Sequence, residues 1–160
     1  MIKTPRTNAM RLLDQAGIEY TVLTYQYDES DLSGLKAAAA LQMPPASICK
    51  TLVLHGDKSG YLVCCLAVDR ETDLKALAAL SGNRSVEMIP QKDLLQLTGY
   101  LRGGCSPIGM KKLYPTFVEE AALAQTKIAI SAGQRGCQLL LAPGDLVRFI
   151  AARTGRFSRD

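Results

Sequence analysis

The sequence predicts a mixed α/β fold in which a mixed, partly closed β-sheet is flanked by helices, in one domain spanning residues 1–160. Helical and strand-like segments are interspersed along the whole chain. Several strand-like segments are joined by short glycine-containing turns, which connect antiparallel neighbours, so a purely parallel doubly wound sheet is not expected. The length suits one ordinary domain.

Apolar residues at helical spacing, with capping and stop residues at the ends, predict the helices. Thr4 and Pro5 are expected to start the first helix and Gly17 to end it, whereas Ser33 is expected to cap the second, which Pro44-Pro45 stops. The others are expected over residues 73–80, closed by Gly82, 90–97, ended by Gly99, 120–124 and 146–152, the last after Pro143-Gly144-Asp145.

Apolar, β-branched and aromatic runs bounded by turn residues predict the strands. Residues 61–68 are almost continuously apolar, so this strand should be central in its sheet. It follows residues 48–55 through a hairpin turn at 56–60. Further strands are expected over residues 18–25, 86–89, 116–118, 127–131 and 137–141, with a polar loop at 27–31, an irregular glycine loop at 100–112 and a turn at 132–136.

The composition excludes several classes of protein. Hydrophobic residues make up 48% and charged residues 21%, as in globular proteins, and no apolar run approaches a membrane span. The N-terminus lacks the apolar core of a signal peptide, so a cytoplasmic location is expected. The five cysteines include no C-x-x-C pair and are expected to be reduced, mostly buried side chains. With His55 as the single histidine, neither a metal site nor a cofactor is expected.

The net charge of +4 permits an anionic partner without requiring one. Positive charge gathers near the C-terminus, and we expect a solvated helix face followed by a frayed tail there, in preference to an RNA contact. The residues concerned are Arg148, Arg153, Arg156 and Arg159.

Lys50 is the first candidate functional residue. Strand periodicity places it on the same face as Ile48 and Leu52, while Thr51 points the opposite way. An unpaired buried ammonium is costly, so Lys50 must reach either solvent at a sheet edge or a ligand-binding cleft. In a cleft it would contact an anionic or carbonyl-bearing ligand, such as the terminal ribose or phosphate of a nucleic acid.

Two glycine-rich turns are the next candidates. Residues 103–109 read Gly-Gly-Cys-Ser-Pro-Ile-Gly, and Gly103 and Gly104 would let backbone N–H groups approach a ligand oxygen, unless this is only a tight structural turn. Met110 stands where a phosphate-binding P-loop needs lysine, which excludes that motif. In residues 131–136, Ser131 and Gly133 could face a ligand beside Arg135; the alternative is a glycine hairpin with an exposed arginine.

No protein nucleophile is well supported. The sequence has no G-x-S-x-G elbow, and any catalytic triad would depend on His55. Cys105 lies in the glycine loop but would need the same histidine as its base, and no acidic pair is evident. Hydrolysis here would rely on backbone donors, a lysine and groups of the substrate.

Taken together, these segments resemble the YbaK/EbsC family, which is related to the editing domain inserted in bacterial prolyl-tRNA synthetases. The matching motifs occur in family order over essentially the whole chain. They are Thr4-Pro5 with Leu12-Leu13, Thr24-Tyr25, Cys49-Lys50-Thr51-Leu52, Lys75 with Val86-Glu87-Met88, Thr98-Gly99-Tyr100-Leu101 leading into Gly103 to Gly109, Ser131 to Gly136, and Ala142 to Leu146.

The resemblance implies a curved, barrel-like sheet and deacylation of mischarged tRNA without a metal, with Cys-tRNA(Pro) as the leading substrate. It makes aminoacyl-tRNA the expected partner and prolyl-tRNA synthetase a further one, with no role for DNA or a membrane. Lys50 matches the lysine most closely tied to activity. The positions that match pocket-lining residues are Tyr25, Thr51, Gly103, Gly104 and Ser131, and we add Ser106, Gly133 and Arg135 as candidate substrate contacts.

Three positions depart from the family pattern. Cys105 stands where the loop often carries an aliphatic residue, Ala132 replaces a frequent glycine, and Gln138 lies where some members carry an acid. The aminoacyl group therefore stays open, as does the attacking group, which is either the thiol of a cysteine substrate or a water molecule. A non-catalytic module that binds tRNA or a synthetase is the alternative function, and a redox or metal protein is disfavoured by the scattered cysteines.

Overall fold

The computed structural model describes residues 5–160 and has the mixed α/β architecture that the sequence predicts. The helices are α1 (Asn8–Gln15), α2 (Gly34–Leu41), α3 (Leu74–Ser81), α4 (Leu94–Thr98), α5 (Glu120–Leu123) and α6 (Pro143–Phe149), with 3-10 turns η1 (Pro45–Ser47) and η2 (Gln91–Asp93). The strands are β1 (Thr21–Thr24), β2 (Cys49–Gly56), β3 (Gly60–Ala67), β4 (Glu71–Thr72), β5 (Val86–Met88), β6 (Thr116–Glu119), β7 (Ile128–Ser131), β8 (Cys137–Leu141), β9 (Arg153–Gly155) and β10 (Ser158–Arg159).

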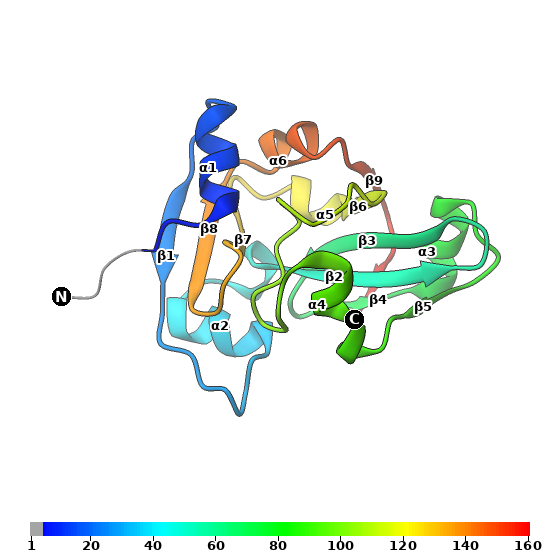
Figure 1. Ribbon diagram of the computed structural model, residues 1–160, viewed down its shortest axis with the longest axis horizontal. Coiled ribbons are helices and arrows are strands. Elements are labelled where there is room, and N and C mark those ends of the chain that lie inside the picture. Colours follow the sequence, from blue (N-terminus) through cyan, green and yellow to red (C-terminus); the bar gives the residue numbers. More distant parts are fainter. Residues whose placement is uncertain (1–4) are drawn as a thin grey trace.

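The strands of the described residues form three sheets. The largest has the order β5-β2-β3-β6-β9, in which β3 is central as predicted. Its β2–β3 hairpin is antiparallel with Gly56 opposite Gly60, whereas β3–β6 and β6–β9 are parallel, so the sheet is mixed. The second sheet, β1-β8-β7, is antiparallel, and β10 pairs with β4. Figure 1 shows the hairpin extending away from the second sheet.

The two larger sheets meet at a parallel bridge between Ile48 and Ala129 and then separate. Beyond the bridge, β2 pairs with β3 on one side, but on the other side its pairing with β5 begins only at Leu54. Just before that point the Ile89 N–H donates to the Val53 carbonyl at 3.3 Å. The strands of residues 5–160 therefore form no closed barrel, and the expected barrel-like curvature stops at this open edge.

Apolar side chains fill both faces of the large sheet. One core joins β3, β7 and β8 to α1 and α6, and includes Met10, Leu13 and Leu146. The second lies between the opposite face and α3, and includes Leu66 and Leu77. Alternating residues of β3 enter the two cores, so Leu62 to Leu66 are fully buried.

Several local signals at helix ends act as predicted, but α6 begins at Pro143 and ends at Phe149 rather than spanning 146–152, and the helix expected over 90–97 is the turn η2 followed by α4. The Ser33 and Asp73 side chains accept hydrogen bonds from the N–H groups of residues three positions later, and Gly82 and Gly99 end α3 and α4 with positive φ. The first helix, in contrast, begins at Asn8 and is capped by Thr7. The expected cap Thr4 lies outside the described residues.

The prediction of a frayed C-terminal tail is wrong. After α6 the chain forms β9 and β10, and Phe157 between them is buried in the second core. The Phe157 N–H donates to the buried Glu119 carboxylate at 2.7 Å, and its carbonyl accepts from the Asp73 N–H at 2.6 Å. The arginines suggested a solvated tail, but one apolar side chain between them anchors it.

Replacing Phe157 with alanine should lower the free energy of unfolding by about 3–5 kcal/mol, because a fully buried ring is lost from the core. Urea denaturation measures this change. Arg159→Ala is the matched control, since Arg159 is exposed and its variant should stay within about 0.5 kcal/mol of wild type. Equal stability of the Phe157 variant and wild type would contradict the anchored tail.

None of the helices within residues 5–160 is long and apolar enough to cross a lipid bilayer.

Candidate active site

A cavity of about 340 Å³ occupies the gap where the two larger sheets separate. Its size lies in the usual range for small-ligand sites. The open edge of β2 forms one wall, and the ends of β1, β7 and β8 form another. The lining also includes residues from α2, β5, η2, α4 and the 100–112 loop. Among the lining residues are Tyr25, Ser33, Cys49, Lys50, Thr51, Val53, Met88, Gln91, Leu94, Arg102, Gly103, Cys105, Ser131 and Gln138.

Lys50 and Thr51 both line the cavity although they lie on opposite faces of β2. Lys50 pairs in register with Leu66 of the second core, and the Thr51 hydroxyl lies 3.8 Å from the Cys65 sulfur of the first. Both can contribute because the cavity opens at the edge of the strand rather than over one face. Lys50 is half-buried. Of the two positions expected for Lys50, solvent at a sheet edge or a cleft, the structure shows it in a cleft.

The electrostatics of the cavity favour an anionic ligand. Its charged lining residues are Lys50 and Arg102; within residues 5–160 the lining contains no aspartate, glutamate or histidine. Desolvation lowers the pKa of the Lys50 ammonium below its ordinary value, and more distant Glu71 and Asp69 act in the opposite direction. A nearby negative charge from a ligand would offset this desolvation.

The glycine loop contributes through Gly103 rather than through both glycines. Gly103 lines the cavity with φ of +84°, and a Cβ there would lie 3.2 Å from the Leu32 Cβ. Its N–H has no acceptor in the described part of the chain. Gly104 differs from expectation, because its N–H donates to the Leu101 carbonyl at 2.9 Å and it is buried outside the lining. Its missing side chain instead admits the Gln134 backbone, 3.0 Å from a Cβ.

Arg135 lies outside the cavity and contacts the peptide group that links Arg102 to Gly103. Its Nε donates to the Arg102 carbonyl at 2.9 Å, and its guanidinium lies 4.0 Å from the Glu29 carboxylate. The Arg102 carbonyl and the Gly103 N–H belong to one peptide unit, and in a trans peptide they point in opposite directions. Arg135 thus holds the Gly103 N–H on the side away from itself. Arg135, which the sequence suggested as a substrate contact, therefore lines a small neighbouring hollow and not the cavity itself.

Ser106 and Gly133, two further candidate substrate contacts, stabilise the local backbone and do not line the cavity. Ser106 is fully buried, and its hydroxyl accepts a hydrogen bond from the Ile108 N–H at 3.2 Å, so it stabilises the loop. Gly133 has φ of +107° and faces the Tyr100 ring, and its N–H donates to the Ser131 hydroxyl at 3.1 Å. Neither residue lines the cavity, but Gly133 orients the Ser131 hydroxyl, which does.

The cavity thiols are poor nucleophiles. Burial raises the pKa of Cys49 and of Cys105 to about 12, so few thiolates exist near neutral pH. His55, the base that either would need, is exposed and packs on Tyr61 outside the lining. All five cysteines are free, as predicted. The described residues offer no cluster of three or more His, Cys, Asp or Glu side chains for a metal ion.

Comparison with known proteins places this geometry in a family. Residues 33–149 match the family model for the aminoacyl-tRNA editing domain. The chain is also 46% identical, over 138 residues, to EbsC of Enterococcus faecalis, whose name describes a candidate Cys-tRNA(Pro)/Cys-tRNA(Cys) deacylase. That alignment covers 86% of this chain and 84% of EbsC. The chain belongs to the aminoacyl-tRNA editing domain family.

Solved structures show the same fold. A hypothetical protein, APE2540, superimposes with a TM-score of 0.84 at 22% identity, over 93% of this chain and 97% of its own. A candidate trans-editing enzyme for prolyl-tRNA synthetase gives a TM-score of 0.80 at 20% identity, over 98% of this chain and the whole of its own. The editing-domain fold, predicted from the resemblance, is therefore confirmed.

Gln138 is the residue of the editing-domain cavity that sequence reasoning undervalued. It is 7% exposed, and its Oε1 has no hydrogen-bond partner among residues 5–160. Burial raises the pKa of the neighbouring Tyr25 hydroxyl, and a hydrogen bond with the Gln138 side chain offsets part of the rise. A polar residue inside the apolar run 137–141 was the available signal. Its unpaired oxygen leaves an acceptor available to a donor on the ligand.

Substituting methionine for Gln138 should raise the free energy of unfolding by about 1 kcal/mol, because a buried unpaired acceptor is replaced by an apolar group of similar size. Thermal and urea denaturation measure the change. Gln134→Met, at an exposed position, should leave stability within about 0.5 kcal/mol. A loss of stability would contradict this prediction, because it would mean that the bonds of the Gln138 amide, including the one with Tyr25, stabilise the fold by more than the unpaired oxygen destabilises it.

Proposed function

We propose that this protein is a trans-editing deacylase that removes cysteine from mischarged tRNA(Pro). One observation carries the proposal. Within the described residues, the cavity is lined by Lys50, which is half-buried, and by Gly103, whose N–H has no acceptor, and the lining contains no carboxylate or imidazole. Family membership and the name of EbsC support the same activity.

The cavity suits the acylated 3′ end of an RNA. Lys50 and Arg102 supply positive charge for the terminal phosphate or ribose oxygens. The ester carbonyl would then accept a hydrogen bond from the Gly103 N–H, which stabilises the charge that develops on that oxygen. The Gln138 Oε1 would accept from a donor of the aminoacyl group, such as its ammonium.

The attacking group would come from outside the protein, because the cavity thiols are protonated and the lining within residues 5–160 has no carboxylate or imidazole to act as a general base. In one route the substrate thiol forms a sulfur–carbon bond at the ester carbon. The bond to the ribose oxygen breaks, the thiol proton moves to that oxygen, and a thiolactone leaves. In the other route a water oxygen bonds to the ester carbon, the bond to the ribose oxygen breaks, a water proton moves to that oxygen, and cysteine leaves as the free acid. Both routes need the same carbonyl polarisation.

The proposal extends to the setting of the reaction. Residues 1–160 would act as one editing domain in the cytoplasm, where aminoacyl-tRNA is used. Prolyl-tRNA synthetase is the proposed protein partner, because the synthetase is the source of mischarged tRNA(Pro). The candidate trans-editing structure described above shares this fold, which supports that link.

Lys50→Ala should lower kcat/KM for Cys-tRNA(Pro) by about 10- to 100-fold, the effect of losing a hydrogen bond from a charged group. Wild-type protein should release cysteine from tRNA(Pro) and leave proline attached. The measurement is loss of radiolabelled amino acid from tRNA(Pro) charged with cysteine, alanine or proline. Product analysis by mass spectrometry separates thiolactone from free cysteine.

Lys50→Arg provides the matched control. It should retain activity and keep it at alkaline pH, because arginine stays charged. As the pH is raised, wild-type activity should begin to decrease before pH 10.5 is reached. The reason is that the pKa of Lys50 is lowered, so its ammonium loses its charge at a lower pH than an ordinary lysine does. Unchanged turnover in Lys50→Ala would exclude the ammonium from catalysis. Binding of tRNA without turnover by wild-type protein would instead support a non-catalytic module.

Arg135→Ala should lower kcat about tenfold and leave KM nearly unchanged, because Arg135 positions the Gly103 N–H without touching substrate. Glu29→Gln is the control; it removes only the exposed partner of Arg135 and should behave as wild type. A rise in KM at constant kcat would show that Arg135 binds substrate directly, as the sequence suggested.

A further inference from the structure

Three aromatic side chains form a row across the large sheet at the end away from the second sheet. His55 of β2 lies directly opposite Tyr61 of β3, and their ring centroids are 5.0 Å apart. The Tyr61 ring lies 6.3 Å from that of Tyr114, which leads into β6. Both pairs meet edge to face. His55 is exposed and Tyr61 is 38% exposed, so this apolar row is open to solvent.

Helix α4 connects the row to the cavity. The Tyr114 hydroxyl donates to the Leu97 carbonyl of α4 at 2.7 Å, while Leu94 of the same helix lines the cavity. Val53, another lining residue, precedes His55 by two positions on the same face of β2. The row therefore begins about 7 Å along the strand from the cavity wall. A chain that leaves the cavity reaches the row within a few nucleotide lengths.

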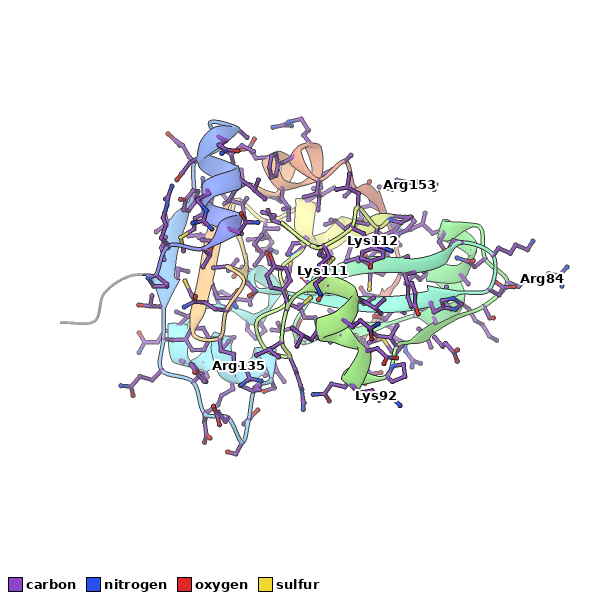
Figure 2. The ribbon with its side chains drawn as sticks, viewed as in Figure 1. Arg84, Lys92, Lys111, Lys112, Arg135 and Arg153 are labelled. Atoms are coloured by element: carbon purple, nitrogen blue, oxygen red, sulfur yellow. The ribbon has the colours of Figure 1, made fainter. Side chains whose placement is uncertain are left out.

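Three lysines surround α4. Figure 2 shows Lys92 below the helix and Lys111 and Lys112 above it. All three are exposed, and none forms an ion pair within residues 5–160. The Lys111 side chain lies over Gly99 at the helix end, 3.4 Å from where a Cβ would stand. Glu87, opposite His55, and Asp93, which follows Lys92, are carboxylates near this surface, whereas Lys111 and Lys112 are two consecutive positive charges.

We propose that this surface, formed by His55, Tyr61, Tyr114 and the lysines at positions 92, 111 and 112, binds the RNA strand that leads out of the cavity. The lysines bind phosphates, and the exposed rings contact sugars and bases. Exposed aromatic side chains combined with cations are the usual platform for single-stranded RNA, whereas a protein interface would be depleted in lysine. The proposal rests on the proposed function, which places the 3′ end in the cavity.

The test measures binding of uncharged tRNA(Pro) transcript over a range of salt concentrations. Replacing Lys111 and Lys112 together with alanine should weaken binding about tenfold and reduce the slope of log K against log salt by about 1.4, because two contacts with phosphates of a single strand are lost. Tyr61→Ala should weaken binding by about fivefold or more with the slope unchanged. Lys75→Ala with Lys127→Ala, two exposed lysines elsewhere, is the control and should match wild type.

Wild-type affinity and slope in the Lys111/Lys112 variant would overturn the proposal. So would loss of prolyl-tRNA synthetase binding with tRNA binding intact, since the surface would then serve a protein. Because the tRNA is uncharged, the result does not depend on turnover. If the protein deacylates tRNA but its RNA affinity does not depend on these residues, only this inference is contradicted. If RNA binding depends on the lysines but no deacylation occurs, only the proposed function is contradicted.

Discussion

The site depends on how the two sheets are joined. Within residues 5–160 a parallel bridge between Ile48 and Ala129 connects their backbones, and immediately beyond it β2 has no strand on its outer edge until β5 begins to pair at Leu54. Full closure would fill this gap with backbone pairing. The open edge instead exposes both faces of one strand to the same cavity, which is why Lys50 and Thr51 can line it together.

Most of the chemistry available in the cavity comes from backbone and charge. The Arg135 guanidinium holds the carbonyl side of the peptide that carries the Gly103 N–H, so an arginine outside the cavity fixes the orientation of a peptide group at the cavity lining. The absence of carboxylate and imidazole from the described lining leaves carbonyl polarisation and substrate positioning as the contributions that this chain can make. An attacking group supplied by the substrate or by water is consistent with that arrangement.

Short-range features were predictable from the sequence and long-range ones were not. The caps at Ser33 and Asp73, the hairpin at residues 56–60 and the alternation of Lys50 and Thr51 follow from local propensity and strand period. The bond from the Gly104 N–H to Leu101 depends on loop conformation, and the position of Arg135 on the Arg102 carbonyl joins residues 33 apart. Burial of Phe157 required knowing that the C-terminus returns to β4. The adjacent glycines and the clustered arginines do not reveal in the sequence how these distant segments meet.

The central claim is that the gap between the sheets holds the acylated end of the substrate. The most direct test records amide chemical shifts of the labelled protein as it is titrated with an unreactive amide analogue of 3′-cysteinyl-adenosine. The account predicts the largest shifts at Lys50, Gly103 and Gln138, which line the gap from separate elements. Shifts confined to the open groove around Tyr20 and Lys127, with these three unchanged, would contradict it.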